Sequence, residues 1–224
     1  MIPRVFHQVW INRQNPALPE KFRAYRDGWL ALHPDWEYKL WNLDNLDFVP
    51  ERNDLLKSAK VYSQMADILR YEILARHGGV YLDTDFECLR NIDPILAGVQ
   101  NFACSEDGGS VSVGILGAVP DSIYMKRCVA ALPEKLGEIS PAQETGPGLM
   151  TKVLLRDGIA GDFTLFPSQW FYPYGLHEPH RANEPFPQSY GVHRWAHSWA
   201  GADRQLLTRV RRKIKRVFQF GSAA

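Results

Sequence analysis

The chain has 224 residues, of which 45% are hydrophobic and 23% charged, values typical of a globular domain with a sizeable core. The formal net charge is +1, but six of the 26 basic residues lie within 209–216, which leaves 20 basic against 25 acidic residues elsewhere. The body of the chain is therefore mildly acidic and its end strongly basic.

Neither a membrane span nor a disulfide framework is predicted. No apolar run reaches the ~18 to 20 residues that cross a bilayer. Cys88, Cys104 and Cys128 are odd in number and lack metal-type spacing, which indicates free thiols in a reducing compartment. The first residues lack the charged and apolar regions of a signal peptide. We therefore expect a cytoplasmic protein.

Hydrophobic periodicity predicts alternating strands and helices. In chain order, the expected elements are a strand at 5–11, a helix at 19–32, a strand at 36–41, a long helix at 55–77, strands at 80–82, 86–89, 101–104 and 112–117, helices at 124–132 and 149–155, and a strand at 163–166. A turn is expected at 91–94. Residues 170–187, rich in Pro, His and aromatics, are expected to form an irregular loop over a site.

The stretch 77–85 combines a helix end, a short strand and two acids. Glycines at 78–79 end the preceding helix, residues 80–82 form a strand, and Asp83 and Asp85 follow where the apolar run ends. Side chains one residue apart on an extended backbone point to opposite faces, so these acids share a ligand only if the chain turns. One interpretation is a Mg²⁺ or Mn²⁺ site beside a phosphate-bearing substrate. The other is an Asx turn at a strand end.

Further candidate residues also have structural alternatives. Trp10, at the end of the first strand, either packs in the core or stacks on a flat ring. Asp67 and Arg70 share a helix face, and they form either an exposed ion pair contributing about a few tenths of a kcal/mol or part of a site. In the aromatic segment 190–199, His193 is either a packed core residue or a Mn²⁺ ligand.

The end of the chain is amphipathic, with basic residues around an apolar helical face. The apolar positions are Leu206, Leu207, Val210, Ile214, Val217 and Phe218. This pattern is typical of a helix that lies on anionic lipid. The alternative is a helix packed on the body with a solvated basic edge. No motif supports nucleic-acid binding, so no nucleic-acid partner is expected.

Four separated blocks together resemble family 32 glycosyltransferases, the DXD-containing sugar transferases that include yeast-type outer-chain mannosyltransferases and bacterial capsule enzymes. The blocks occur in the family's order: IPRVFHQVW at 2–10, HPDW and LW within 33–41, DILRY and GGVYLDTD within 67–85, and HRW and SW within 193–199. The resemblance implies an α/β fold of the GT-A type, a Rossmann-like mixed sheet flanked by helices, as a single domain over 1–202. Residues 203–224 would form a basic amphipathic C-terminal helix.

The resemblance also implies a retaining transferase that uses a UDP- or GDP-linked sugar. The residues expected to bind this nucleotide-sugar are Val9, Trp10, Asp67, Arg70, Tyr81, Asp83, Ser198 and Trp199. Trp10 would stack on the base, and Asp67 and Arg70 would hold the ribose and the sugar. Ser198 and Trp199 would close over the diphosphate and exclude water.

The implied cofactor is Mn²⁺ or Mg²⁺. Asp83 would bridge the ribose, the sugar and the metal, and Asp85 would ligate the cation directly; these two are the expected catalytic residues. His193 is the expected third protein ligand, with His197 as the alternative. Bond cleavage leaves negative charge on the diphosphate, and a bound cation stabilises that charge.

Other features bear on the acceptor and on the donor sugar. Many relatives have Ser where this chain has Ala66 and Asn where it has Val113, so donor-sugar contacts are expected to differ there. Glu144 and the loop 145–148 are expected on the acceptor side, and no nucleophile is assigned. The basic tail favours a glycan or lipid-linked glycan acceptor in surface polysaccharide assembly, with the protein peripheral on the inner face of the membrane.

Two other functions stay open at this point. One is a catalytically degenerate carbohydrate-binding protein on the same fold, against which the intact acidic and histidine residues argue. The other is a phosphatase of the haloacid dehalogenase type, in which the first Asp of an Asp-x-Asp is the nucleophile. That motif normally opens the chain, and Gly161-Asp162 is only a faint echo of the later acidic motif of those phosphatases.

Overall fold

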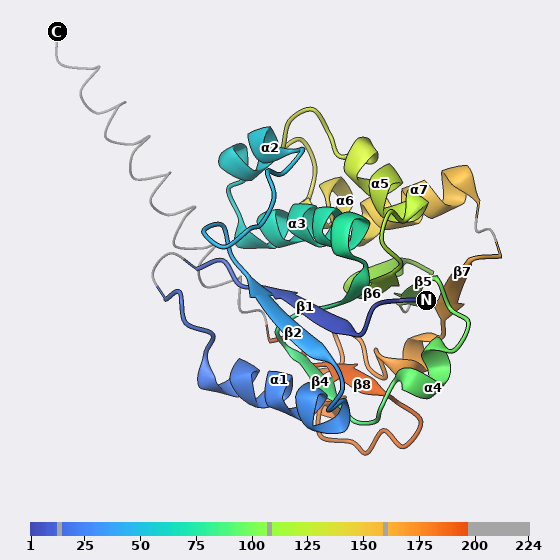
Figure 1. Cartoon of the computed structure of the whole chain (residues 1–224). Helices are drawn as coiled ribbons and strands as arrows, with labels where there is room; N and C mark the ends of the chain where they lie inside the picture. The colour runs from blue at the N-terminus through green and yellow to red at the C-terminus, as the bar shows by residue number, and fades with distance from the viewer. Residues whose placement is uncertain (13–14, 107–108, 159–160, 197–224) are drawn as a thin grey trace, which may run out of the picture.

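A six-stranded mixed sheet forms the centre of the described part of the chain (Figure 1). The structure is a computed structural model that describes residues 1–12, 15–106, 109–158 and 161–196. The sheet has the order β2-β1-β3-β6-β5-β7, with bounds β1 Val5–Val9, β2 Glu37–Trp41, β3 Gly79–Leu82, β5 Asn101–Ser105, β6 Val111–Ala118 and β7 Phe163–Phe166. β6 is antiparallel to both neighbours, and the other pairs are parallel.

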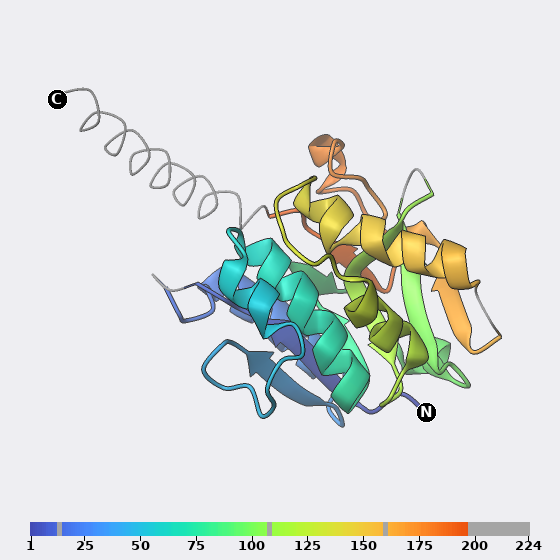
Figure 2. The same cartoon turned by 90° about the horizontal axis from the view of Figure 1, so that it is seen from above.

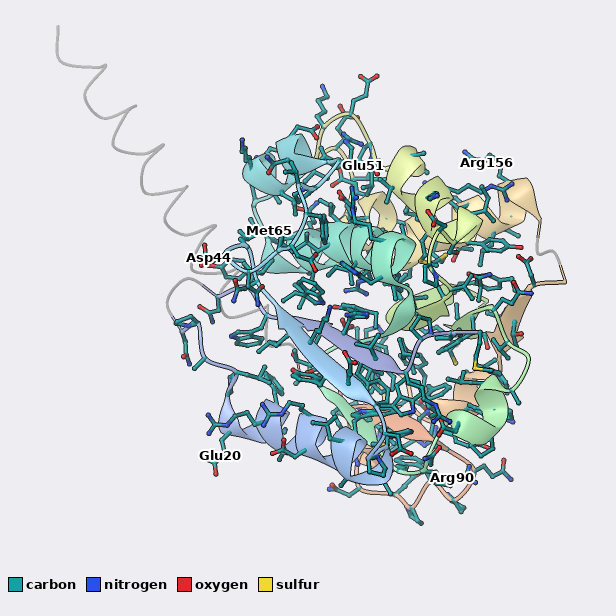
Figure 3. The ribbon with its side chains drawn as sticks, viewed as in Figure 1. Glu20, Asp44, Glu51, Met65, Arg90 and Arg156 are labelled. Carbon is teal, nitrogen blue, oxygen red and sulfur yellow. The ribbon has the colours of Figure 1, made fainter. Side chains whose placement is uncertain are left out.

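Helices cover one face of the sheet, and the helices α1 and α4 with a small second sheet cover the other (Figures 1 and 2). The first layer contains α2 (Asn53–Ser58), α3 (Tyr62–His77), α5 (Ile123–Ala131), α6 (Pro141–Glu144) and α7 (Pro147–Asp157). The second contains α1 (Glu20–Leu32), α4 (Asp93–Leu96) and the antiparallel pair β4 (Phe86–Cys88) and β8 (Gly191–His193). Figure 3 shows side chains filling the space between the layers, whereas exposed Glu20 and Arg156 point outward.

The alternation of side chains along β3 builds both cores. Val80 and Leu82 pack with Trp29 of α1 in one cluster, and Tyr81 packs with Leu69 of α3 in the other. All these side chains are buried, as expected for a strand that is covered on both faces.

Two glycines connect α3 to β3. Gly78 and Gly79 have φ angles of 64° and 91°, which side chains rarely adopt. A Cβ at Gly78 would lie 2.6 Å from the backbone nitrogen of Pro120, and one at Gly79 would lie 2.8 Å from the carbonyl oxygen of Val5. The pair therefore ends the helix and lets β3 start close beside β1.

The mixed α/β sheet flanked by helices is confirmed, with two local corrections. The long helix expected at 55–77 is two helices, α2 and α3, because residues 59–61 leave the helical conformation. The turn expected at 91–94 begins the short helix α4. Residues 170–187 are irregular apart from one 3-10 turn at Pro179–Arg181, and a second 3-10 turn, Ser168–Trp170, directly precedes them. The three cysteines are buried and free. Within the described residues, no helix has the length and apolarity needed to cross a bilayer.

Candidate active site

The two acids lie in a turn at the carboxyl end of β3. The strand ends at Leu82, and the backbone N–H of Phe86 donates to the carbonyl oxygen of Asp83 at 3.1 Å. On an extended chain the side chains of Asp83 and Asp85 would point to opposite faces, and this turn lets them point to the same side. β4 then pairs with β8, and the register places Phe86 opposite His193. The topology thus brings His193 to the acids from more than 100 residues along the chain.

Asp83, Asp85 and His193 form a close group. Nε2 of His193 lies 3.2 Å from Oδ1 of Asp85 and 3.6 Å from Oδ2 of Asp83. The three side chains offer ligand atoms that all lie within 4.8 Å of one another. The second oxygen of Asp85 accepts the backbone N–H of Ala196 at 2.8 Å. Nδ1 of His193 is buried and has no hydrogen-bond partner among the described residues.

Charge–charge interactions within this group shift two pKa values in opposite directions. Burial disfavours the charged imidazole of His193, but Asp85 and Asp83 outweigh it and raise its pKa to about 10. Burial also disfavours the charged form of Asp85, but His193 and the N–H of Ala196 hold its pKa at about 2. At neutral pH the group therefore contains an imidazolium beside an ionised Asp85.

Arg70 connects the acids to α3. One guanidinium nitrogen lies 3.0 Å from Oδ1 of Asp67 and 3.2 Å from Oδ1 of Asp83, and another donates to the carbonyl oxygen of Val113 at 2.6 Å. The Tyr81 hydroxyl donates to the same Asp83 oxygen at 2.9 Å. The interpretation of Asp67 and Arg70 as an exposed pair is wrong, since only 9% and 5% of their side-chain surfaces are exposed. Removing one partner of a buried ion pair typically costs about 3–5 kcal/mol.

A cavity of about 420 Å³ opens beside these residues, a volume typical of small-molecule sites. Its walls include Ser63, Asp67, Arg70, Asp83, His193 and Trp195. Gly114 also lines it, and a Cβ at this position would lie 2.9 Å from Oδ2 of Asp83 and 2.8 Å from the Tyr172 hydroxyl. The absence of a side chain at Gly114 therefore leaves room for Asp83 to face the cavity.

Among the other residues expected to bind the donor, Tyr81 reaches the site through its hydroxyl, and the rest lie elsewhere or outside the described residues. Trp10 is 4% exposed, packs with Leu18 and Phe22, and borders a separate cavity of about 430 Å³. Val9 is buried in the core under the helices, where the Tyr81 ring also packs. His197, Ser198 and Trp199 lie outside the described residues. The roles given to these six residues stay predictions.

Three residues near the site carry information that the sequence pattern did not give. The Thr145 hydroxyl donates to Oδ2 of Asp67 at 2.7 Å, so Thr145 contacts an acid that lines the cavity. The Tyr172 hydroxyl and Oδ2 of Asp83 both lie next to Gly114, where a Cβ would be 2.8 Å and 2.9 Å from them. The glycine-proline motif after Thr145 marked a loop, but no local signal indicated which helix the loop contacts.

The second acid required by the phosphatase hypothesis is not near Asp83. Asp162 accepts a hydrogen bond from the Tyr124 hydroxyl at 2.8 Å and directly precedes β7. The first residue of β7 pairs with Asn101 at the amino end of β5. Asp162 therefore lies at the opposite edge of the sheet from the carboxyl end of β3, and the expected echo of a phosphatase motif is wrong.

Comparison with known proteins supports the resemblance. A family described as a glycosyltransferase sugar-binding region containing a DXD motif matches residues 19–101. A glycosyltransferase of Acanthamoeba polyphaga mimivirus, itself uncharacterized, is 26% identical over 214 residues, which cover 89% of this chain and 84% of the relative. Inositol phosphoceramide mannosyltransferase 1 of Schizosaccharomyces pombe is 27% identical over 238 residues, covering 100% of this chain and 70% of the relative.

A mannosyl phosphorylinositol ceramide synthase of Saccharomyces cerevisiae is 32% identical over 137 residues. That match covers 59% of this chain and 35% of the synthase, so the chain matches about a third of the length of that relative.

Solved structures show the same fold. The PaToxG glycosyltransferase superposes with a TM-score of 0.56 at 15% identity, covering 70% of each chain. A glycosyltransferase involved in the glycosylation of the major capsid of PBCV-1 gives a TM-score of 0.51 at 12% identity, covering 92% of this chain and all of the other. These findings show a GT-A fold and, together with the acidic turn after β3, support the resemblance to the DXD-containing glycosyltransferases of the family 32 type.

Proposed function

We propose that the protein is a metal-dependent, retaining glycosyltransferase that takes a sugar from a nucleotide-diphosphate donor. The observation that carries this proposal is the group of Asp83, Asp85 and His193 beside the 420 Å³ cavity. A sugar-transfer site needs cation ligands, donor contacts and an open cavity in one place. The proposed cation ligands and donor contacts border one cavity at the carboxyl end of β3, which supports the proposal.

The chemistry of the group fits a divalent cation. Two carboxylates and one imidazole suit Mn²⁺, and the carboxylates also suit Mg²⁺. Nε2 of His193 is the nitrogen that faces both carboxylates, so it is the atom that would ligate the cation once deprotonated. When bound, such a cation would stabilise the negative charge on the departing diphosphate.

The residues of the chain would hold the donor and prevent side reactions. Asp67 and Arg70 border the cavity and are proposed to contact the ribose and the sugar. The guanidinium of Arg70 holds one oxygen of Asp83, which leaves the other facing His193 and the proposed cation. Trp195 covers part of the cavity, where it would help to exclude water. No nucleophile is assigned to the retaining step.

For the sugar and the acceptor, we propose mannose and a glycan or a lipid-linked glycan, as in surface polysaccharide assembly. Support for mannose comes from several fungal relatives that are named as mannosyltransferases of inositol phosphoceramide or as mannosyl phosphorylinositol ceramide synthases. A lipid-linked acceptor also agrees with the basic amphipathic sequence at 203–224, which lies outside the described residues. We further propose a cytoplasmic protein that binds anionic membrane through this segment; cosedimentation with phosphatidylserine vesicles, with and without 203–224, tests this.

The test of the proposed function is release of the nucleoside diphosphate from GDP-mannose and from a panel of UDP-sugars, with Mn²⁺ and with EDTA. We expect release from at least one donor that stops in EDTA. Asp85→Asn should abolish it, whereas Asp121→Asn, at an exposed acid paired only with Lys126 among the described contacts, should not. Binding of sugars without turnover of any donor would instead support a degenerate carbohydrate-binding protein.

A further inference from the structure

One face of α3 holds the segment 137–147 in place. Gln64 donates to Oε2 of Glu144 at 2.8 Å, the Thr145 hydroxyl donates to Oδ2 of Asp67 at 2.7 Å, and the Tyr71 hydroxyl donates to the carbonyl oxygen of Thr145 at 2.8 Å. Residues 64, 67 and 71 follow one another along a single helix face. The segment is therefore fixed to the helix that carries the donor-side residues.

Glu144 fixes the loop before this contact. Its carboxylate accepts the backbone N–H groups of Gly137, Glu138 and Ile139 at 2.7–3.1 Å. The side chain of Glu144 is thus committed to the backbone of its own loop. Residues 140–142, which follow that loop, line the same cavity as Asp83. The expectation that Glu144 lies on the acceptor side stays a prediction, and its carboxylate is engaged by these backbone groups and by Gln64.

The proton of the Thr145 hydroxyl has two acceptors within reach but can serve only one at a time. The carbonyl oxygen of Pro141 lies at 3.1 Å and Oδ2 of Asp67 at 2.7 Å. The bond to the carboxylate is shorter and charge-assisted, and such bonds are about twice as strong as neutral ones. Gly146 permits this approach, since a Cβ there would lie 3.3 Å from the same Asp67 oxygen.

A chain of hydrogen bonds and ion pairs connects Thr145 to the proposed cation site. Thr145 holds one oxygen of Asp67, and Arg70 holds the other at 3.0 Å. Arg70 then holds Oδ1 of Asp83 at 3.2 Å, while Oδ2 of Asp83 faces His193. Asp67 and Arg70 are both largely buried in the cavity wall, so losing a partner there is costly. Loss of the Thr145 hydroxyl would leave a buried carboxylate oxygen unsatisfied and release the constraint on Arg70.

We propose that Thr145 is a positioning residue, whose hydroxyl orients Asp67 so that Arg70 presents Asp83 to the cation and the donor. This inference rests on the proposed function. It predicts that Thr145 affects the affinity for the nucleotide and its metal, although its hydroxyl points to Asp67 and not to the proposed ligands of the metal.

The test compares Thr145→Val, which removes the hydroxyl at nearly constant volume, with Thr145→Ser, which keeps it. Isothermal titration with Mn²⁺ alone, and with UDP or GDP in the presence of Mn²⁺, gives the affinities, and thermal unfolding gives the stability. We expect Thr145→Val to weaken nucleotide binding roughly tenfold and Thr145→Ser to stay within about threefold of wild type. If Thr145→Val does not fold, Thr145→Ala removes the same hydroxyl with no risk of overpacking, and the same loss is expected.

Thr151→Val is the matched control. The Thr151 hydroxyl donates to the carbonyl oxygen of Pro147 at 2.7 Å and accepts the N–H of Val111 at 2.9 Å, so it is an equally engaged threonine nearby. We expect this variant to unfold at a lower temperature but to keep its nucleotide affinity.

Two results would overturn the inference while the proposed function stands. One is wild-type affinity in Thr145→Val or Thr145→Ala, and the other is an equal loss in Thr145→Ser, which would show that the hydroxyl does not carry the effect. A wild-type protein that binds neither Mn²⁺ nor nucleotide would refute the proposed function itself, and this inference with it. The wild-type titration therefore separates the two failures.

Discussion

The affinity for Mn²⁺ should depend steeply on pH, because His193 must lose a proton before its imidazole can serve as a ligand. Asp85 and Asp83 raise the pKa of His193 to about 10, against the opposing effect of burial. Asp85 keeps its charge throughout the neutral range, since its pKa is held at about 2. Below pH 10, metal binding therefore has to displace a proton from His193.

The size of the effect follows from this pKa. Well below a ligand's pKa, each pH unit changes the apparent affinity about tenfold, so the affinity for Mn²⁺ should rise roughly 100-fold between pH 6 and pH 8. A histidine with an ordinary pKa near 6.5 would give only about a fourfold rise over the same range. At pH 7.5, binding should release about one proton with the raised pKa and about 0.1 with the ordinary one.

Electron paramagnetic resonance of free Mn²⁺ measures the affinity, and calorimetry in buffers of different ionisation enthalpy counts the protons. His193→Ala is the control, and it should bind Mn²⁺ more weakly and lose most of the pH dependence. Any slope that remains near pH 6 is assigned to Asp67, whose pKa burial raises to about 6 against Arg70 and Thr145. A fourfold change in the wild type, or the same slope in His193→Ala, would refute the reasoning.

Three further predictions concern stability and the cavity. Without metal, the raised pKa of His193 stabilises the fold fully below about pH 6.5, and this stabilisation is lost as the pH rises toward 10. The lowered pKa of Asp85 stabilises the fold above about pH 3.8, and that stabilisation is lost as the pH falls through 2. The unfolding temperature of the wild type should therefore fall relative to that of His193→Gln between pH 6.5 and 9. Unfolding temperatures that change in parallel with pH would contradict this. Gly114→Ala should weaken Mn²⁺ binding roughly tenfold in titrations, since its Cβ would displace Asp83, and unchanged binding would argue against that crowding. Gly28→Ala in α1, where a Cβ meets nothing within 4 Å, should stabilise the protein by about 0.5–1 kcal/mol in urea unfolding with turnover unchanged; a loss of stability would contradict the space seen there.

The sequence was most informative where local chemistry decides the structure. Gly78 and Gly79 end a helix and start a strand because their backbone angles exclude side chains, and this is visible in the residue types themselves. Asp83 and Asp85 can share a ligand only if the chain turns between them. The hydrogen bond from the N–H of Phe86 to the carbonyl oxygen of Asp83 closes such a turn. The fold type followed from the order of four motif blocks.

Tertiary packing decided the features that could not be predicted. Periodicity joined α2 to α3 because the residues between them, 59–61, continue an amphipathic pattern while leaving the helix. Spacing alone could place Asp67 and Arg70 on one face but could not show that this face is buried against β6 and the loop at 145. The antiparallel direction of β6 is likewise set by its pairing with β3 and β5, which no local pattern specifies.

The central claim is that one divalent cation binds between Asp83, Asp85 and His193. Crystals grown with Mn²⁺ and either UDP or GDP, with diffraction data collected at the manganese absorption edge, test it most directly. We expect a single strong anomalous peak bounded by these three side chains and by the diphosphate of the nucleotide. A bound nucleotide with no such peak, or with the peak away from both acids, would show that the cation does not bind there.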